Sequence, residues 1–267
     1  MRELTTGINQ YYKKSRRFLR KVIDYANRNV MGTITHVTTE DPVVALTFDD
    51  GPHPVYTPRL LDILEDYQAH ATFFMVGHAA SRHSDLVRRV SMAGHSIGNH
   101  SWDHPSFPLI RGNERRAQIR ACARALAPYG QKIFRPPYGN QNVASRLDAL
   151  RLGYLVVTWN IVAGDWLQDD AETIVDRVES RIKKGSIILF HDSLYHSLEA
   201  QYAGRDVTLK AVDILLNKIG HHFRFVTIPE LVRHGRPQRT MTWEKPDVNL
   251  LNKLQGQYSP PRRYSVL

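Results

Sequence analysis

The stretch that decides the predicted fold class is residues 43–76, VVALTFDDGPHPVYTPRLLDILEDYQAHATFFMV. It begins with an apolar, β-branched run at residues 43–48 and ends with another apolar run at residues 71–76. Both runs have the length and composition of buried strands. Residues 57–67, between them, carry leucine and isoleucine at helical spacing. A strand, a helix and a strand in this order predict two parallel strands joined by a helical crossover.

The same alternation of strand and helix continues along the chain. We predict further strands at residues 96–99, 132–135, 154–159, 186–190 and 224–227. We predict further helices at residues 84–93, 114–126, 143–152, 171–183 and 207–219. Because the strands are apolar almost throughout, both faces of their sheet should be covered. The predicted fold class is therefore α/β, a distorted (β/α) barrel with seven parallel strands.

Polar side chains follow five of the predicted strands at the points where the strands end. They are Asp49, His100, Arg135, Asp165 and His191. In a barrel these ends converge on one face, which is where active sites are built. An open sheet would instead collect its ligands at one switch point and leave the other strand ends unused. The distribution favours the barrel and predicts one polar site.

The length of 267 residues is enough for one large domain or two small ones. We place the main domain at residues 41–232, an N-terminal extension at residues 1–40 and a C-terminal tail at residues 233–267. Within the extension, residues 12–25 (YKKSRRFLRKVIDY) predict a basic amphipathic helix. Such a helix could make a peripheral contact with an anionic membrane surface or pack on its own domain.

The composition excludes several classes of protein. With 42% hydrophobic and 23% charged residues, the chain can bury a core, but its apolar runs are too short to cross a membrane. Cys122 is the only cysteine, so there is no disulfide framework. The formal net charge of +10 suggests an anionic partner, but no nucleic-acid-binding motif accompanies it, and we expect no nucleic-acid partner. Since no apolar segment follows the basic N-terminus, we expect a cytoplasmic protein, with the inner face of the membrane as an additional site.

Two adjacent carboxylates, Asp49 and Asp50, follow the first strand. Buried carboxylates are costly unless a cation or donor compensates them, although Asp-Asp-Gly-Pro is also an ordinary turn sequence. His100 and His104 have a spacing that can place two metal ligands on one face of a helical turn, but a chain with 13 histidines also produces it by chance. Together with one aspartate, the two histidines would make a metal site with open positions for water or substrate.

Five motifs occur in an order and spacing that resemble the polysaccharide deacetylases, the NodB-homology domain of carbohydrate esterase family four. The motifs are Thr47-Phe-Asp-Asp-Gly51, His100-Ser-Trp-Asp-His104, Arg135-Pro-Pro-Tyr-Gly139, Asp165-Trp166 and Leu189-Phe-His191. The resemblance covers residues 43–228 and implies that residues 41–232 form a catalytic domain of this type. It implies a metal-dependent hydrolase that removes acetyl groups from sugars, most often from N-acetylglucosamine units.

The resemblance also implies the metal and the proton-transfer residues. Asp50, His100 and His104 would hold a divalent cation, usually Zn²⁺, with Co²⁺ or another transition metal as alternatives. Asp49 would be the general base, and His191 the general acid. These roles suit the chemistry, because amide hydrolysis needs an activated water and a protonated leaving nitrogen.

Four further roles follow from the same resemblance. Arg135 would orient the base, the backbone N–H of Tyr138 would help to bind the oxyanion, Leu189 would line the acetyl pocket, and Trp166 would form a wall of the sugar groove. Taken alone, the two prolines after Arg135 indicate only a rigid connection.

The chain departs from the family pattern at Val162, where relatives usually carry an aspartate that orients the acid histidine. Asp165, Asp192 or Asn160 could replace that carboxylate. Three alternatives to N-deacetylation remain: O-deacetylation of a polysaccharide such as xylan, glycan binding with weak or no turnover, and metal-independent amide hydrolysis by barrel relatives.

Overall fold

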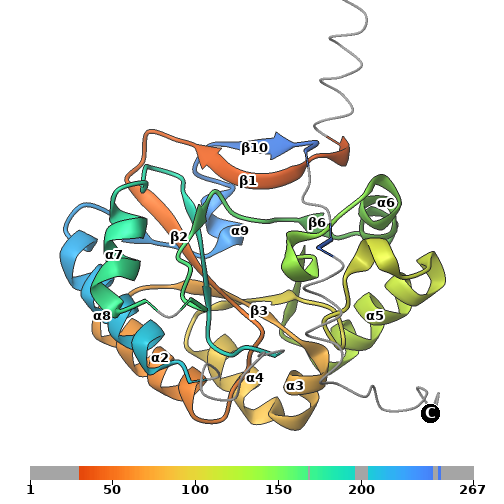
Figure 1. The fold of residues 1–267 in the computed structure, drawn as a ribbon, viewed down its shortest axis with the longest axis horizontal. Coiled ribbons are helices and arrows are strands. Elements are labelled where there is room, and N and C mark those ends of the chain that lie inside the picture. Colours follow the sequence, from red (N-terminus) through yellow and green to blue (C-terminus); the bar gives the residue numbers. More distant parts are fainter. Residues whose placement is uncertain (1–29, 168, 196–203, 243–245, 248–267) are drawn as a thin grey trace, which may run out of the picture.

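The computed structural model describes residues 30–167, 169–195, 204–242 and 246–247 (Figure 1). Its main sheet is a curled half-barrel of parallel strands in the order β6-β5-β4-β3-β2-β8-β7, which confirms the predicted fold class. The strands are β2 (Val43–Asp49), β3 (Ala71–Met75), β4 (Ser96–Asn99), β5 (Gly130–Phe134), β6 (Leu155–Val156), β7 (Ile161–Val162) and β8 (Ile187–His191).

Helices lie around the outside of this sheet (Figure 1). They are α2 (Tyr56–Asp66), α3 (Gly77–Arg82), α4 (Ser84–Met92), α5 (Gly112–Ala125), α6 (Val143–Arg151), α7 (Ala171–Glu179) and α8 (Asp206–Ile219). The short helix α9 (Ile228–Leu231) instead packs against the inner face of the sheet, and 3₁₀ turns lie at Phe107–Leu109 and Pro137–Gly139. Side-chain caps begin α6 at Asn142, α7 at Asp170 and α9 at Thr227. These caps satisfy amide groups that the first turn of a helix leaves without partners.

Two of the predicted strands take a different form. Of residues 154–159, only Leu155 and Val156 form a strand, β6, which pairs with β5 at one edge of the sheet. The next strand, β7, comes after the predicted range and pairs with β8 at the other edge. The intervening segment crosses the open side of the half-barrel, where the amide of Thr158 donates to Ile34 O at 2.8 Å. The segment predicted at 224–227 forms only β9 (Arg224–Phe225), which pairs with the first residues of β2.

A two-stranded antiparallel sheet lies across the side of the barrel that the helices leave uncovered (Figure 1). It pairs β1 (Thr33–Thr38) with β10 (Arg236–Thr240). β1 falls inside the segment that we assigned to the N-terminal extension, and β10 falls inside the segment that we assigned to the C-terminal tail. Ile34 and Val37 attach β1 to the barrel, because their side chains are buried in its core. The predicted basic helix at 12–25 lies outside the described residues.

The core has two principal parts, one on each face of the main sheet. An inner cluster fills the half-barrel and includes Ile34, Phe74, Val157 and Ile187. A larger outer cluster joins the strands to the helices. No helix among the described residues has both the length and the apolar character needed to span a bilayer. The packed interior leaves the strand ends as the place where polar groups gather.

Candidate active site

The carboxylate of Asp49, the last residue of β2, is paired with the guanidinium of Arg135, which follows β5. Arg135 Nη1 donates to Asp49 Oδ1 at 2.7 Å and to Thr47 Oγ1 at 2.8 Å, and Nη2 donates to Thr158 O at 2.9 Å. Arg135 is fully buried and Asp49 nearly so. Burial lowers the pKa of Arg135, while the charge of Asp49 and its hydrogen bond counter that effect. The pair therefore fixes one oxygen of Asp49.

Asp50, His100 and His104 converge next to this pair. Asp50 Oδ1 lies 3.5 Å from His100 Nε2 and 3.2 Å from His104 Nε2. One ligand atom from each of the three residues lies within 4.8 Å of the others. All three side chains are buried, so the cluster lies beneath the surface.

The turn that carries the two histidines is not the helical turn that their spacing suggested. Ser101 and His104 have positive φ values of 67° and 60°. The amide of Ser101 donates to Asn99 Oδ1 at 2.9 Å, and the amide of His104 donates to Ser101 Oγ at 3.1 Å. These side-chain bonds stabilise a tight left-handed turn. It brings the imidazole centroids of His100 and His104 to 4.8 Å from each other.

The hydrogen bond of His100 defines its tautomer. Nδ1 lies 2.8 Å from the carbonyl oxygen of Arg135. A carbonyl oxygen can only accept, so Nδ1 carries a proton and Nε2 is the ring nitrogen that lies toward Asp50. This is the arrangement expected of a metal-binding histidine whose other nitrogen is held by the backbone.

The cluster fits a divalent cation. Asp50 Oδ1 is buried, and no described residue donates a hydrogen bond to it. Burial by itself would raise the pKa of Asp50, but His104, His100 and His191 outweigh it and hold that pKa well below its usual range. An ionised carboxylate and two imidazoles suit Zn²⁺ and the other transition metals that bind nitrogen and oxygen.

His191, the last residue of β8, is held by Asp165. Its Nδ1 donates to Asp165 Oδ1 at 3.0 Å, and its backbone amide donates to Asp165 Oδ2 at 2.9 Å. Burial would lower the pKa of His191, but the charge and hydrogen bond of Asp165, with Asp50 and Asp49, raise it to about 9. Of the three substitutes for a carboxylate at Val162, Asp165 is the one that contacts the imidazole.

Three further predicted residues lie around these groups. The ring of Trp166 is 5.1 Å from that of His191 and nearly perpendicular to it, and 40% of the residue is exposed. Tyr138 has φ 58°, and its ring lies 4.4 Å from the imidazole of His104. Leu189 is buried in β8, opposite Thr47 of β2. The structure thus gathers the predicted site residues at one end of the sheet.

The chain is similar to known deacetylases in sequence and in fold. The sequence model of the polysaccharide deacetylase family matches residues 36–157. A peptidoglycan-N-acetylglucosamine deacetylase of Bacillus cereus is 35% identical over 207 residues, which cover 74% of this chain and 92% of that protein. The chain belongs to the polysaccharide deacetylase family.

Two further comparisons agree with this assignment. A chitooligosaccharide deacetylase of Azorhizobium caulinodans is 32% identical over 191 residues, which cover 69% of this chain and 91% of that protein. A crystal structure of a peptidoglycan N-acetylglucosamine deacetylase matches with a TM-score of 0.68 and 30% identity, covering 76% of this chain and 94% of that one. The sequence resemblance is thereby confirmed at the level of the family and its fold.

The candidate active site contains two residues that the sequence analysis missed. The backbone amide of Tyr195 donates to Asp50 Oδ2 at 3.1 Å, and its hydroxyl is hydrogen-bonded with His78 Nδ1 at 2.9 Å. Tyr195 thereby turns the other carboxylate oxygen, Oδ1, toward the two histidines. Tyr195 comes four positions after the end of β8, and His78 comes three positions after the end of β3. A search for polar side chains shortly after each predicted strand could therefore have found both.

Asp192, which follows His191, was named as one possible replacement for a carboxylate at Val162, but its contacts lie elsewhere. Thr57 donates a hydrogen bond to its carboxylate, which packs against Gly51 so closely that a Cβ there would overlap it. Burial raises the pKa of Asp192 to about 7; the bond from Thr57 opposes this rise, while Asp50 and Asp49 add to it. Glycine is needed at position 51 because the carboxyl group takes the space of a side chain.

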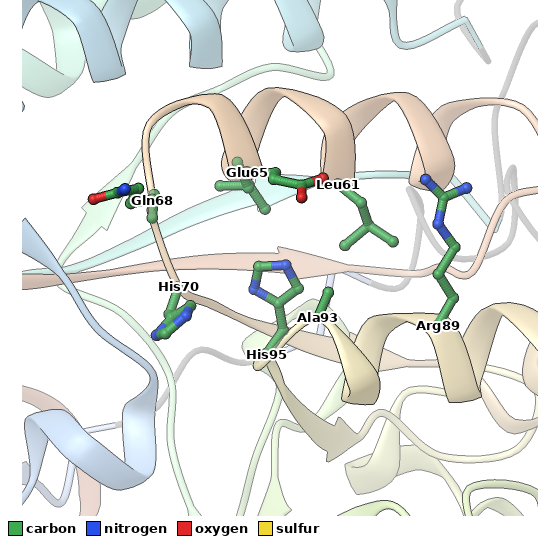
Figure 2. A pocket seen from close by; sticks show the side chains of 9 residues that line it. Leu61, Glu65, Gln68, His70, Arg89, Ala93 and His95 are labelled. Carbon is green, nitrogen blue, oxygen red and sulfur yellow. The ribbon is translucent and has the colours of Figure 1, made fainter.

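A separate pocket lies at the opposite ends of the strands. It has a volume of about 370 Å³ between α2 and α4 (Figure 2). His70 and His95, which line it, come directly before β3 and β4, whereas the residues of the candidate active site lie at or after the ends of the strands. His95 Nδ1 accepts the amide of Ala71 at 3.2 Å, and burial lowers its pKa to about 4. His95 is therefore neutral and tied to the start of a strand.

Proposed function

We propose that this protein is a metal-dependent deacetylase that hydrolyses the acetamido group of N-acetylhexosamine residues of the N-acetylglucosamine type. The observation that carries the proposal is the position of Asp49 between the candidate metal ligand His100 and the candidate acid His191. In the sheet order β4-β3-β2-β8, Asp49 ends β2, His100 follows β4 and His191 ends β8. A base therefore lies between a candidate metal site and a candidate acid.

Asp50, His100 and His104 would hold the cation. When bound, a divalent cation polarises a carbonyl oxygen and lowers the pKa of water. Asp49 would take the proton from the attacking water. Arg135 suits this role, because it fixes Asp49 Oδ1 and leaves Oδ2 facing His100 at 3.7 Å.

His191 would donate a proton to the leaving nitrogen. An amine leaves poorly unless it is protonated, so the group opposite the base must carry a proton at neutral pH. Asp165 supports this state by accepting from Nδ1, which leaves Nε2–H for transfer. In this proposal the backbone N–H of Tyr138 binds the developing oxyanion, and Leu189 lines the acetyl pocket.

The relatives and an aromatic side chain beside His191 support the proposed substrate class. The relatives named above are deacetylases of peptidoglycan N-acetylglucosamine and of chitooligosaccharides. Trp166, partly exposed beside His191, supplies an aromatic wall of the kind that lines ligand sites. We expect an acetylated saccharide or glycoconjugate to lie against it.

The test is acetate release from a panel of N-acetylated saccharides, with acetylxylan as the O-acetyl alternative. The expected result is release from N-acetylglucosamine oligomers that a chelator abolishes and added Zn²⁺ or Co²⁺ restores. Release only from acetylxylan would support the esterase alternative. Saccharide binding without release would support the glycan-binding alternative. Release that is insensitive to chelator would contradict the metal assignment.

A further inference from the structure

Asp165 has contacts beyond His191, and they come from the start of α8. Thr208 Oγ1 donates to Asp165 Oδ2 at 3.2 Å. Arg205 Nη1 donates to the backbone oxygen of Asp165 at 3.0 Å and lies 3.8 Å from Oδ2. The carboxylate of Asp165 is completely enclosed. It is therefore shared among His191, Thr208 and Arg205.

The burial of Arg205 is costly unless a charge compensates it. The residue is only 3% exposed, and Thr208 is 2% exposed. Burial lowers the pKa of Arg205, and the charge of Asp165 is the largest influence that opposes this, ahead of Asp50. A buried arginine needs a paired anion and fixed hydrogen bonds, and Asp165 supplies both. Arg205 thus lies beside the carboxylate that holds the imidazole of His191.

A carboxylate between two cationic groups binds each of them less strongly than it would bind one. The Nδ1 atom of His191 contacts Asp165, and Asp49 is the partner of His191 on the neighbouring strand β2. The charges of Asp49 and Asp50 also act on His191, and Arg205, directly before α8, is the cation on the other side of the Asp165 contact. The three carboxylates favour the charged imidazolium, while Arg205 disfavours it. The hydroxyl of Thr208 further stabilises the negative charge of Asp165 and so reduces its demand for the imidazole proton.

We propose that Arg205 and Thr208 are positioning residues for His191: acting through Asp165, they hold the carboxylate in place and limit how tightly it retains the imidazole proton. This inference rests on the proposed acid role of His191. A general acid must be protonated and yet able to release its proton, so a carboxylate that bound the imidazolium too strongly would slow transfer. The start of α8 therefore belongs to the functional unit.

The experiment compares Arg205→Gln, Arg205→Lys and Thr208→Val with the unmodified metal-loaded protein. Two quantities are measured: the alkaline limit of kcat/KM on an N-acetylglucosamine oligomer, and the pKa of His191 from NMR titration of its imidazole. Arg205→Gln should raise both by about one pH unit, because a nearby positive charge is lost. Thr208→Val should raise them by less, and Arg205→Lys should restore values near those of the unmodified protein.

Arg177→Gln is the matched control. Arg177, on α7, donates to the carbonyl of Ala163 and pairs with Asp169, so it supports the same connection without contacting the Asp165 carboxylate. This variant should lower thermal stability and leave the His191 pKa unchanged. A loss of activity in Arg205→Gln and Thr208→Val with the same His191 pKa would overturn the proposal. If Arg205→Gln does not fold, the Thr208→Val titration decides.

The NMR titration also separates this proposal from the proposed function. If the protein released no acetate from any saccharide, the deacetylase assignment would fail while a raised His191 pKa in Arg205→Gln still supported the coupling. If acetate were released and the His191 pKa stayed fixed in both α8 variants, the coupling would fail and the deacetylase assignment would stand.

Discussion

One hydrogen of Arg135 Nη1 binds the general base candidate Asp49, and the other binds Thr47, one pleat earlier on the same strand. The guanidinium is therefore anchored to β2 by a neutral bond and by a charged one, from a position after β5. This relationship separates two functions of Arg135, because the bond to Thr47 supports the packing and the bond to Asp49 sets the direction of a carboxylate.

Asp49→Asn tests that separation. The change removes the charge that compensates buried Arg135, so we expect a loss of about 3 kcal/mol of unfolding free energy, measured by urea denaturation. It also removes the base, so kcat should fall by about 10²-fold or more. Thr47→Val is the control, with a stability loss of about 1–3 kcal/mol and kcat within about tenfold of the unmodified protein. Equal losses of kcat in both variants would contradict the base assignment.

The candidate metal site is tested by Asp50→Asn. An amide binds a transition metal less well than an ionised carboxylate, so the variant should lose both bound metal and activity. Zn²⁺ should raise the melting temperature of the unmodified protein, because a ligand of the folded state alone stabilises it, and this rise should be absent in the variant. Asp103→Asn, in the same turn but outside the cluster, should keep the rise. Unchanged metal content in Asp50→Asn, measured by elemental analysis, would rule the ligand set out.

Much of the fold could be predicted because local patterns and long-range packing agree. The run at 43–48 is apolar apart from Thr47, and it is buried as β2, which lies between β3 and β8. The prediction of one strand at 154–159 was wrong, because an apolar pattern does not reveal that the chain changes its pairing partner from β5 to β1. Val157 pairs with Ile34 of β1, more than a hundred residues away, and this contact ends β6. The short polar strand β10 likewise depends on β1 for its pairing.

The candidate site, like the fold, could be predicted only in part. Asp49, Asp50 and His100 were identifiable because carboxylates and imidazoles directly after buried strands need compensation. The left-handed turn from Ser101 to His104 was not, since it depends on the side chain of Asn99 and on the hydroxyl of Ser101 itself. Arg205 was also missed, because its partner Asp165 is 40 residues distant and only the fold brings them together.

Asp165→Asn tests the proton-transfer role of His191. The folded-state pKa of His191 is raised to about 9, so the acid is protonated at neutral pH, and kcat/KM should fall about tenfold per unit above that value. Removing the carboxylate charge lowers the His191 pKa, so the alkaline limit should move down by about one unit or more. This direction is opposite to that expected for Arg205→Gln. An alkaline limit that does not move would assign the acid to another group. His191→Gln should lose the limit along with most of the rate.

Asp192 predicts a pH dependence of stability. Its pKa is raised by folding to about 7, so the unfolded state loses this proton at lower pH than the folded state does. The contribution of Asp192 to the unfolding free energy should therefore be greatest below about pH 4 and fall by about 4 kcal/mol at most as the pH rises to about 7. Asp192→Asn should remove this fall, measured by denaturation in chelator across that range. Asp148→Asn is the contrasting control, because Arg115 and Arg116 lower the pKa of Asp148 despite its burial, and its loss should cost stability at neutral pH. If the unfolding free energy of Asp192→Asn fell by the same amount over this pH range, the fall would have to come from groups other than Asp192.

Trp166→Ala separates saccharide binding from support of the acid. Trp166 is partly exposed and its ring lies nearly perpendicular to that of His191, while Asp165 holds the imidazole independently. If the exposed face contacts the sugar, KM for an N-acetylglucosamine oligomer should rise by about tenfold, equivalent to about 1.4 kcal/mol, with kcat changed much less. Leu167→Ala is the matched control, since Leu167 is 52% exposed and adjacent in the chain, and it should leave both constants within about twofold. A hundredfold fall in kcat at constant KM would show that Trp166 acts by packing against His191, and the sugar would then have to be bound by other side chains.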